Sequence, residues 1–234
     1  MKVVILCGGK GIRFHEQTKY IPKPLLKIGD KPILWHIMKY YSVFGYKDFI
    51  LCLGYQGDKI RQYFQPGHKE WEIKFVDTGQ DASKATRIKK IQPYINEEDF
   101  FVTYGDDLSN VDLNRLLDHH LRHKRVVTLT AVNPYSQFGI LELAKEGMIT
   151  NFHEKPRLEY WINGGFFVFN REIFNYLQPN QDLEKDVFRN LAQKGEIIAY
   201  CHRGFWGCMN TYKDNLQLNE LWKKKEASWA IWRK

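Results

Sequence analysis

Short apolar runs alternate with amphipathic stretches along the first half of the chain. Lys2–Cys7 is a continuous apolar run, typical of a strand buried on both faces of a parallel sheet. Lys31–Phe44 repeats its apolar residues at helical spacing, with Pro32 suited to the first turn and Gly45 to the end. The same alternation predicts strands at Lys47–Leu53, Trp71–Val76, Asp99–Tyr104 and Arg125–Val132, and helices at Asp58–Phe64 and Asp112–His123.

The second half has a different pattern. Phe138–Leu143 and Met148–Phe152 flank a short turn containing Gly147, which predicts a β-hairpin. The sequence Asn163-Gly164-Gly165 precedes another apolar run. The remaining expected elements are helices at Arg171–Leu177 and Leu183–Lys194, a strand at Glu196–Cys201 and a terminal helix at Thr211–Lys224.

This order predicts an α/β fold with one domain over residues 1–234. We expect a doubly wound, mostly parallel (Rossmann-like) mixed sheet with right-handed crossovers and a small β-hairpin and helical appendage. Ligands bind at the carboxyl ends of the strands in such sheets. Functional side chains are therefore expected directly after strands.

Composition narrows the classes of function. The chain has 234 residues, of which 44% are hydrophobic and 26% charged, the balance of a soluble globular protein. No apolar run approaches the roughly 20 residues of a membrane span, and the N-terminal run is too short for a secretion signal. We therefore expect a cytoplasmic protein without a membrane partner.

The net charge of +8 favours an anionic partner. Basic residues are dispersed apart from Lys223-Lys224-Lys225, and no nucleic-acid motif occurs, so phosphorylated metabolites fit better than nucleic acid. The four cysteines form no CxxC pair, and we expect them to be reduced and structural. His119, His120 and His123 are expected on an exposed helix face.

The first candidate motif is the loop Cys7-Gly8-Gly9-Lys10-Gly11-Ile12-Arg13. Its glycines allow close backbone approach to a ligand and can aim N–H groups at phosphates, and Arg13 adds a cation. The loop is not a Walker A motif, because no Gly-Lys-Ser/Thr follows at the right spacing, and it is not a dinucleotide fingerprint, because Phe14 stands where the last glycine would be. A sharp strand-to-helix turn is the structural alternative.

The second motif is Pro22-Lys23-Pro24. Each proline fixes its own φ and biases the preceding residue toward extended backbone, so Lys23 lies on a stiff segment suited to a cation at a reacting phosphate. A surface lysine in a proline-rich turn is the alternative.

The third motif, Tyr104-Gly105-Asp106-Asp107, ends a predicted strand. A carboxylate there, opposite a phosphate loop, suits Mg²⁺, which prefers one or two carboxylates together with phosphates and water. An aspartate that merely starts a turn is the alternative.

Two later motifs offer polar groups next to turns. Glu154-Lys155-Pro156 and Asn163-Gly164-Gly165 together provide an acceptor, a cation and an amide, a set that suits sugar hydroxyls and a phosphate. Either could equally be an ordinary turn.

The order of these motifs resembles a known family. The segments GGxGxR, PKP, LWHIMKYYSVFGYKDFILCLGY, VDTG, TYGDD, EKP, NGGFFVFN and GFW-x-x-Met-x-Thr are similar to those of the glucose-1-phosphate cytidylyltransferases, in the sugar nucleotidyltransferase superfamily. The resemblance covers essentially the whole chain. It implies an enzyme that condenses CTP with a sugar-1-phosphate, glucose-1-phosphate first, by in-line attack on the α-phosphorus, giving a CDP-sugar and pyrophosphate.

The resemblance also implies roles for individual residues. The catalytic set would be Arg13, Lys23 and Asp106. Nucleotide contacts would come from Cys7, Gly8, Gly9, Gly11, Arg13, Lys23, Thr78, Gly79, Tyr104 and Gly105. Sugar contacts would come from Glu154, Lys155, Asn163 and Gly164. Asp106 and Asn210 would hold Mg²⁺, with Asp107 as a further candidate. Residues 1–132 would form the nucleotide-binding half, and residues 133–234 the sugar-binding half with the C-terminal helices.

The chain departs from the family pattern in its loops. Ile12 and Phe14 replace the family's Thr and Leu, which removes a hydroxyl from the phosphate loop. Ala85 and Thr86 replace paired glycines near the base, which leaves a different NTP or another phosphorylated acceptor as an alternative. The resemblance implies a homo-oligomer. The segment between Phe64 and Trp71 is shorter than in typical members of the family, so the contacts between subunits are expected to differ from theirs.

The last departure concerns the metal. Asn210 stands in the family's Met-Asp-Thr motif where a metal-binding aspartate is usual, and Asp107 replaces the usual glycine after Asp106. We hypothesise that Asp107 restores the lost charge. A catalytically impaired nucleotide-binding homologue is the alternative.

Overall fold

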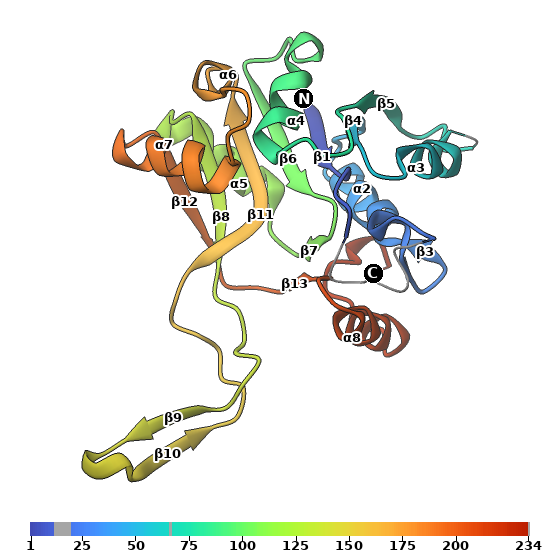
Figure 1. The fold of residues 1–234 in the computed structure, drawn as a ribbon. Helices are drawn as coiled ribbons and strands as arrows, with labels where there is room; N and C mark the ends of the chain where they lie inside the picture. The colour runs from blue at the N-terminus through green and yellow to red at the C-terminus, as the bar shows by residue number, and fades with distance from the viewer. Residues whose placement is uncertain (12–19, 66, 234) are drawn as a thin grey trace.

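A central sheet of seven strands organises the chain (Figure 1). The computed structural model describes residues 1–11, 20–65 and 67–233. In spatial order the strands are β12 (Ile197–His202), β8 (Val127–Val132), β11 (Ile162–Asn170), β6 (Asp99–Tyr104), β1 (Lys2–Leu6), β4 (Asp48–Leu53) and β5 (Glu72–Asp77). Only β11 runs antiparallel to its neighbours, β6 and β8. The predicted mixed, mostly parallel α/β fold is confirmed.

Both faces of the sheet are covered, as its apolar strands require. In β1, Val3 and Ile5 join one buried cluster and Val4 joins the other. The first cluster contains residues of α2 (Ile33–Val43), α3 (Gly57–Phe64), α5 (Leu113–His123) and α8 (Tyr212–Lys223). The second contains residues of α4 (Lys84–Lys90), α6 (Ile173–Tyr176), a π-helix (Leu183–Phe188) and α7 (Arg189–Gln193). The sheet is therefore doubly wound.

Short elements complete the fold. Two small antiparallel sheets pair β2 (Lys27–Ile28) with β3 (Lys31–Pro32), and β7 (Asp107–Ser109) with β13 (Trp206–Cys208). Short 3-10 helices occupy Lys23–Leu25, Gln92–Tyr94, Lys145–Gly147 and Ile231–Arg233. No helix among the described ranges is long and apolar enough to cross a bilayer.

Several predictions need correction. α4 was not anticipated, because a seven-residue helix rich in Lys and Arg shows little apolar periodicity. The stretch Leu183–Lys194 is a π-helix followed by α7 rather than one helix. His120 is 2% exposed, not on a solvated face, because its ring bonds Thr128 Oγ1 at 2.8 Å and Asp99 Oδ1 at 3.1 Å.

The predicted hairpin forms an arm that extends away from the sheet (Figure 1). It consists of β9 (Ile140–Leu143) and β10 (Ile149–His153), and every residue of both strands is exposed. Its exposed apolar side chains include Leu143 at 62% and Phe152 at 60%. An isolated two-stranded hairpin is only marginally stable in water, so packing against another protein surface would stabilise the arm.

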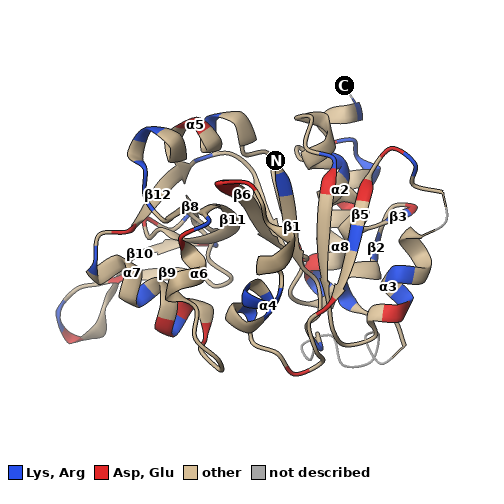
Figure 2. Cartoon of the chain, turned by 90° about the horizontal axis from the view of Figure 1, so that it is seen from above, with Lys and Arg blue, Asp and Glu red and all other residues tan. Residues whose placement is uncertain are grey.

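Charged side chains are spread over many elements. Figure 2 shows Lys and Arg on α3, α4 and α5, with Asp and Glu interspersed. This distribution fits the dispersed basic residues of the sequence rather than a single basic stripe.

Candidate active site

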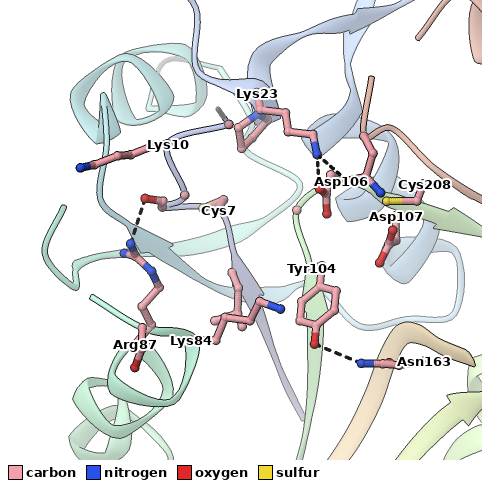
Figure 3. A pocket seen from close by; sticks show the side chains of 18 of the residues that line it. Cys7, Lys10, Lys23, Lys84, Arg87, Tyr104, Asp106, Asp107, Asn163 and Cys208 are labelled. Atoms are coloured by element: carbon pink, nitrogen blue, oxygen red, sulfur yellow. Dashed lines mark hydrogen bonds and ion pairs between the residues drawn. The ribbon is translucent and has the colours of Figure 1, made fainter. Parts of the chain in front are cut away.

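Three sequence motifs that are far apart in the chain line one cavity of about 710 Å³ (Figure 3). The glycine loop follows β1, Lys23 begins a 3-10 helix, and Asp106 follows β6. β1 and β6 are parallel neighbours, so their carboxyl ends open into the same space. The predicted site residues that line this cavity are Cys7, Gly8, Gly9, Gly11, Lys23, Tyr104, Gly105, Asp106, Asp107, Asn163 and Asn210.

The glycine loop is closely packed at its start. A Cβ on Gly8 would lie 2.8 Å from the backbone nitrogen of Gly54 and would collide with the Arg87 guanidinium. Gly11 has a φ of 61°, which side chains rarely adopt. Only glycine therefore fits at both positions. Arg13, like Ile12 and Phe14, lies outside the described residues.

Arg87 braces this loop from behind. It is 4% exposed, and its guanidinium donates to the carbonyls of Gly8 at 2.9 Å and Leu53 at 3.0 Å and to the hydroxyl of Thr78 at 2.6 Å. Desolvation lowers its pKa. Sequence reasoning did not single out Arg87. The sequence shows only one of several basic residues in a stretch whose helix, α4, was not predicted, so the direction of the Arg87 side chain could not be inferred.

Lys23 lies where its flanking prolines direct it. Pro22 is extended, with φ −62° and ψ 142°, and Pro24 lies in the 3-10 helix that Lys23 begins. The Lys23 ammonium forms an ion pair with Asp106 and donates to Asn210 Oδ1 at 3.2 Å. The stiff segment thus brings a cation next to the proposed metal ligands.

A second acidic group lies beside Asp106. Asp107 begins β7 and lies opposite Cys208 of β13. One carboxylate oxygen from Asp106, one from Asp107 and the Cys208 sulfur all lie within 4.8 Å of one another. Burial, followed by the negative charge of Asp106, raises the pKa of Asp107 well above its usual range. Burial and the nearby carboxylates likewise raise the pKa of Cys208.

These groups can accommodate a divalent cation. Asp107 is 3% exposed, and its Oδ1 has no hydrogen-bond partner in the described part of the chain. A buried carboxylate oxygen without a partner is costly, and a cation would satisfy it. Asp106, Asp107 and the carbonyl of Asn210 are oxygen donors of the type that Mg²⁺ binds. The residues therefore fit the predicted metal.

The far side of the cavity carries a polar chain. Asn163 Nδ2 donates to the Tyr104 hydroxyl at 3.2 Å (Figure 3). That hydroxyl in turn donates to Glu184 Oε1 at 2.6 Å. Lys84 forms an ion pair with Glu184, and its nitrogen lies 4.3 Å from the centre of the Tyr104 ring. Burial, more than the adjacent carboxylate, raises the pKa of Tyr104, so this hydroxyl stays protonated. Trp206 also lines the cavity, and so do Lys84 and Asp182, which the sequence predictions did not include.

Other predicted residues stand outside the lining. Thr78 is buried behind the loop, where its hydroxyl donates to the Leu53 carbonyl at 2.6 Å, and Gly79 follows it. The Gly164 carbonyl accepts from Trp206 Nε1 at 2.8 Å. Glu154 and Lys155 are exposed on the segment that follows β10 of the arm. These residues support the lining or lie on the arm.

Cys7 also lines the cavity, but it is not a nucleophile. Burial raises the pKa of its thiol to about 12, so the thiolate is scarce near neutral pH. Its sulfur donates to the Cys52 carbonyl at 3.4 Å, which makes it part of the packing under the loop.

The chain is similar in sequence to known enzymes over its whole length. A "probable glucose-1-phosphate cytidylyltransferase" of Bacillus subtilis is 42% identical over 257 residues, covering 99% of this chain and all of the relative. The glucose-1-phosphate cytidylyltransferase of Salmonella typhimurium is 39% identical with the same coverage. The alignment spans 257 positions, whereas this chain has 234 residues. At least 23 positions of the alignment therefore have no residue in this chain.

Solved structures share the fold. HddC from Yersinia pseudotuberculosis superposes with a TM-score of 0.75 at 23% identity, over 94% of this chain and 99% of that one. Apo UDP-glucose pyrophosphorylase gives 0.75 at 20% identity, over 96% and 98%. The sequence profile described as nucleotidyl transferase matches residues 2–225. The chain therefore belongs to the nucleotidyl transferase family, among the relatives of the glucose-1-phosphate cytidylyltransferases.

Proposed function

We propose that the protein condenses CTP with a sugar-1-phosphate, glucose-1-phosphate first, to form a CDP-sugar and pyrophosphate. A phosphate oxygen of the sugar-1-phosphate attacks the α-phosphorus of CTP, and the bond from that phosphorus to the bridging oxygen of pyrophosphate breaks. The observation that carries this proposal is the common cavity of the glycine loop, Lys23 and Asp106. Positioning and charge stabilisation supply most of the catalysis in such transfers.

Each motif then has a role in the reaction. Backbone N–H groups of Gly8, Gly9 and Gly11 cradle the triphosphate, with Arg13 as an added cation and the Thr78–Gly79 strand end near the nucleotide. Lys23 exchanges its contact with Asp106 for the reacting phosphates and neutralises the charge that develops there. A Mg²⁺ ion held by Asp106 and Asn210, with Asp107, supplies further neutralisation of the phosphates when bound.

The sugar phosphate is assigned to the Asn163 side of the cavity. Asn163 and the backbone at Gly164 offer groups for hydroxyls. Glu154 and Lys155 lie on the exposed arm segment and do not line the cavity of their own chain. Their contact with sugar phosphate requires the arm to pack against another copy. We therefore infer a homo-oligomer in which the apolar arm is buried, which sedimentation analysis of wild type and a Leu143→Asp, Phe152→Asp variant would test.

Residues 1–132 serve the nucleotide and residues 133–234 the sugar in this scheme. We place the reaction in the cytoplasm, where nucleoside triphosphates are made and where its four free cysteines stay reduced.

A different nucleotide is the second candidate. Ala85 is fully buried at the start of α4, and Lys84 beside it lines the cavity, so the wall near the base differs from the paired-glycine pattern. A different base or acceptor could be selected there without a change in the phosphate chemistry.

Pyrophosphate release tests both candidates. Purified protein with Mg²⁺ is incubated with CTP, UTP, dTTP, GTP or ATP against glucose-1-phosphate and mannose-1-phosphate. We expect release to be fastest with CTP and glucose-1-phosphate. Preference for another pair would select the second candidate, and no release with any pair would indicate an impaired homologue and overturn both.

A further inference from the structure

Asp107 and Cys208 face each other across the small sheet formed by β7 and β13, and the proposed function gives Cys208 no role. The antiparallel register of β7 and β13 places them directly opposite. Side chains on opposed residues of such a pair are close neighbours. Both line the cavity, so an ion could reach them from the nucleotide side.

The Asp107 carboxylate is held in place by its surroundings. It is 3% exposed, and its Oδ2 fills the space in which a side chain on Gly165 would stand. Gly165 has a φ of 77°, so glycine is favoured there and the space stays open. The other oxygen, Oδ1, has no hydrogen-bond partner among the described residues. The fold thus buries a carboxyl group that interacts with the Cys208 thiol and has one oxygen, Oδ1, without a partner among the described residues.

Asn210 is less available as a ligand. Like Asp106, it already contacts the Lys23 ammonium, at 3.2 Å from its Oδ1, but unlike Asp106 it carries no charge to hold a cation. The second carboxyl group near Asp106 is instead that of Asp107, the next residue in the chain. The Cys208 sulfur completes the cluster, in which the three ligand atoms lie within 4.8 Å of one another (Figure 3).

We propose that Asp106, Asp107 and Cys208 form a mixed oxygen and sulfur site that binds a borderline divalent ion of the Co²⁺ or Zn²⁺ type more tightly than Mg²⁺. Thiolate ligands favour such ions, whereas Mg²⁺ takes oxygen ligands in near-octahedral geometry and retains water. Burial and the nearby carboxylates raise the pKa of Cys208, so its sulfur is a thiol before the ion binds and releases its proton to solvent when it coordinates the ion. This inference deepens the proposed function, because any role of the ion in turnover rests on that function. Binding of the ion, however, can be measured without turnover.

Co²⁺ is the probe, because a thiolate bound to it gives a sulfur-to-metal charge-transfer band in the near ultraviolet. The protein is titrated with Co²⁺ under argon without nucleotide. We expect the band in wild type, its loss in Cys208→Ser and a fall in Co²⁺ affinity of at least about tenfold in Asp107→Asn. Cys201→Ser is the matched control, because Cys201 is exposed and does not line the cavity, and it should keep the band.

Competition tests the selectivity. Zn²⁺ should displace Co²⁺ at comparable concentration, whereas Mg²⁺ should need at least about a hundredfold excess, which corresponds to about 2.8 kcal/mol. Absence of a band in wild type, a band that survives Cys208→Ser, or displacement by equimolar Mg²⁺ would each overturn the proposal. Cys208→Ala repeats the test of the sulfur ligand should Cys208→Ser fail to fold.

The two proposals fail separately. Pyrophosphate release with Mg²⁺ but no cobalt–thiolate band would refute only the mixed site. The band without pyrophosphate release would refute only the proposed function.

Discussion

The Lys23 ammonium forms an ion pair with the carboxylate of Asp106, 83 residues further along the chain. Both side chains are largely withdrawn from solvent, with exposures of 13% and 25%. This contact joins the proline-braced segment to the end of β6 at the floor of the cavity. It is the point at which the proposed phosphate cation and metal ligand meet.

Lys23→Ala should lower kcat by about 100-fold or more, because a cation placed at the developing charge cannot be replaced by water at equal strength. Steady-state pyrophosphate release measures this. Lys47→Ala is the control, because Lys47 is exposed and does not line the cavity, and its kcat should match wild type. A Lys23→Ala enzyme with wild-type kcat would remove Lys23 from the mechanism.

Arg87→Met should lower the free energy of unfolding by about 3 kcal/mol, because it removes three buried hydrogen bonds, to the carbonyls of Gly8 and Leu53 and to the Thr78 hydroxyl, each of which contributes about 1 kcal/mol. Urea denaturation measures the loss. Loosening of the glycine loop should also raise the KM for CTP. Arg115→Met is the matched control, since the Arg115 side chain is 78% exposed. Equal stability of the two variants would contradict the bracing role.

Asn163→Ala should raise the KM for glucose-1-phosphate by about tenfold, the equivalent of one hydrogen bond. The KM for CTP should change much less, because Asn163 lies on the side of the cavity assigned to the sugar. The ratio of the two KM values serves as an internal control. A larger rise in the KM for CTP would place Asn163 at the nucleotide instead.

His36 should make stability depend on pH. Burial is the main cause that lowers its pKa to about 4, although the Ile28 carbonyl and Asp30 act in the opposite direction and Arg233 adds to the lowering. The unfolded chain protonates the ring near pH 6.5. It therefore binds more protons than the folded chain between pH 6.5 and 4, and the free energy of unfolding falls by about 3 kcal/mol as the pH is lowered through this window.

Urea denaturation at pH 7 and pH 4.5 checks this sign. His36→Gln cannot titrate, so its stability should fall less over the same interval. The exposed His153→Gln variant should behave as wild type. Identical pH dependence in His36→Gln and wild type would show that another group controls the slope.

The sequence predicted the parts of this fold that periodicity encodes. Strand β6 has the predicted bounds, and β1 differs by one residue, because buried parallel strands are continuous apolar runs. The pairing of β7 with β13 was not predictable, since its three-residue strands come from positions about 100 residues apart and carry no pattern. Neighbours such as Cys208 beside Asp107 follow from that pairing.

The candidate site residues also differ in how far the sequence reveals them. Lys23 and Asp106 could be singled out as candidates because flanking prolines and a strand end leave local signals. Arg87 was missed because its direction depends on α4, and the burial of His120 depends on contacts with Thr128 and Asp99 of the sheet. Long-range packing, rather than local propensity, decides these positions.

The central claim is that the Gly8–Gly11 loop, Lys23 and Asp106 act on the same triphosphate. A crystal structure of the protein with CTP and Mg²⁺ tests it most directly. The account predicts the triphosphate between the backbone amides of the loop and the Lys23 ammonium, with the metal on Asp106. A nucleotide bound elsewhere, or with its phosphates turned away from Lys23, would contradict it.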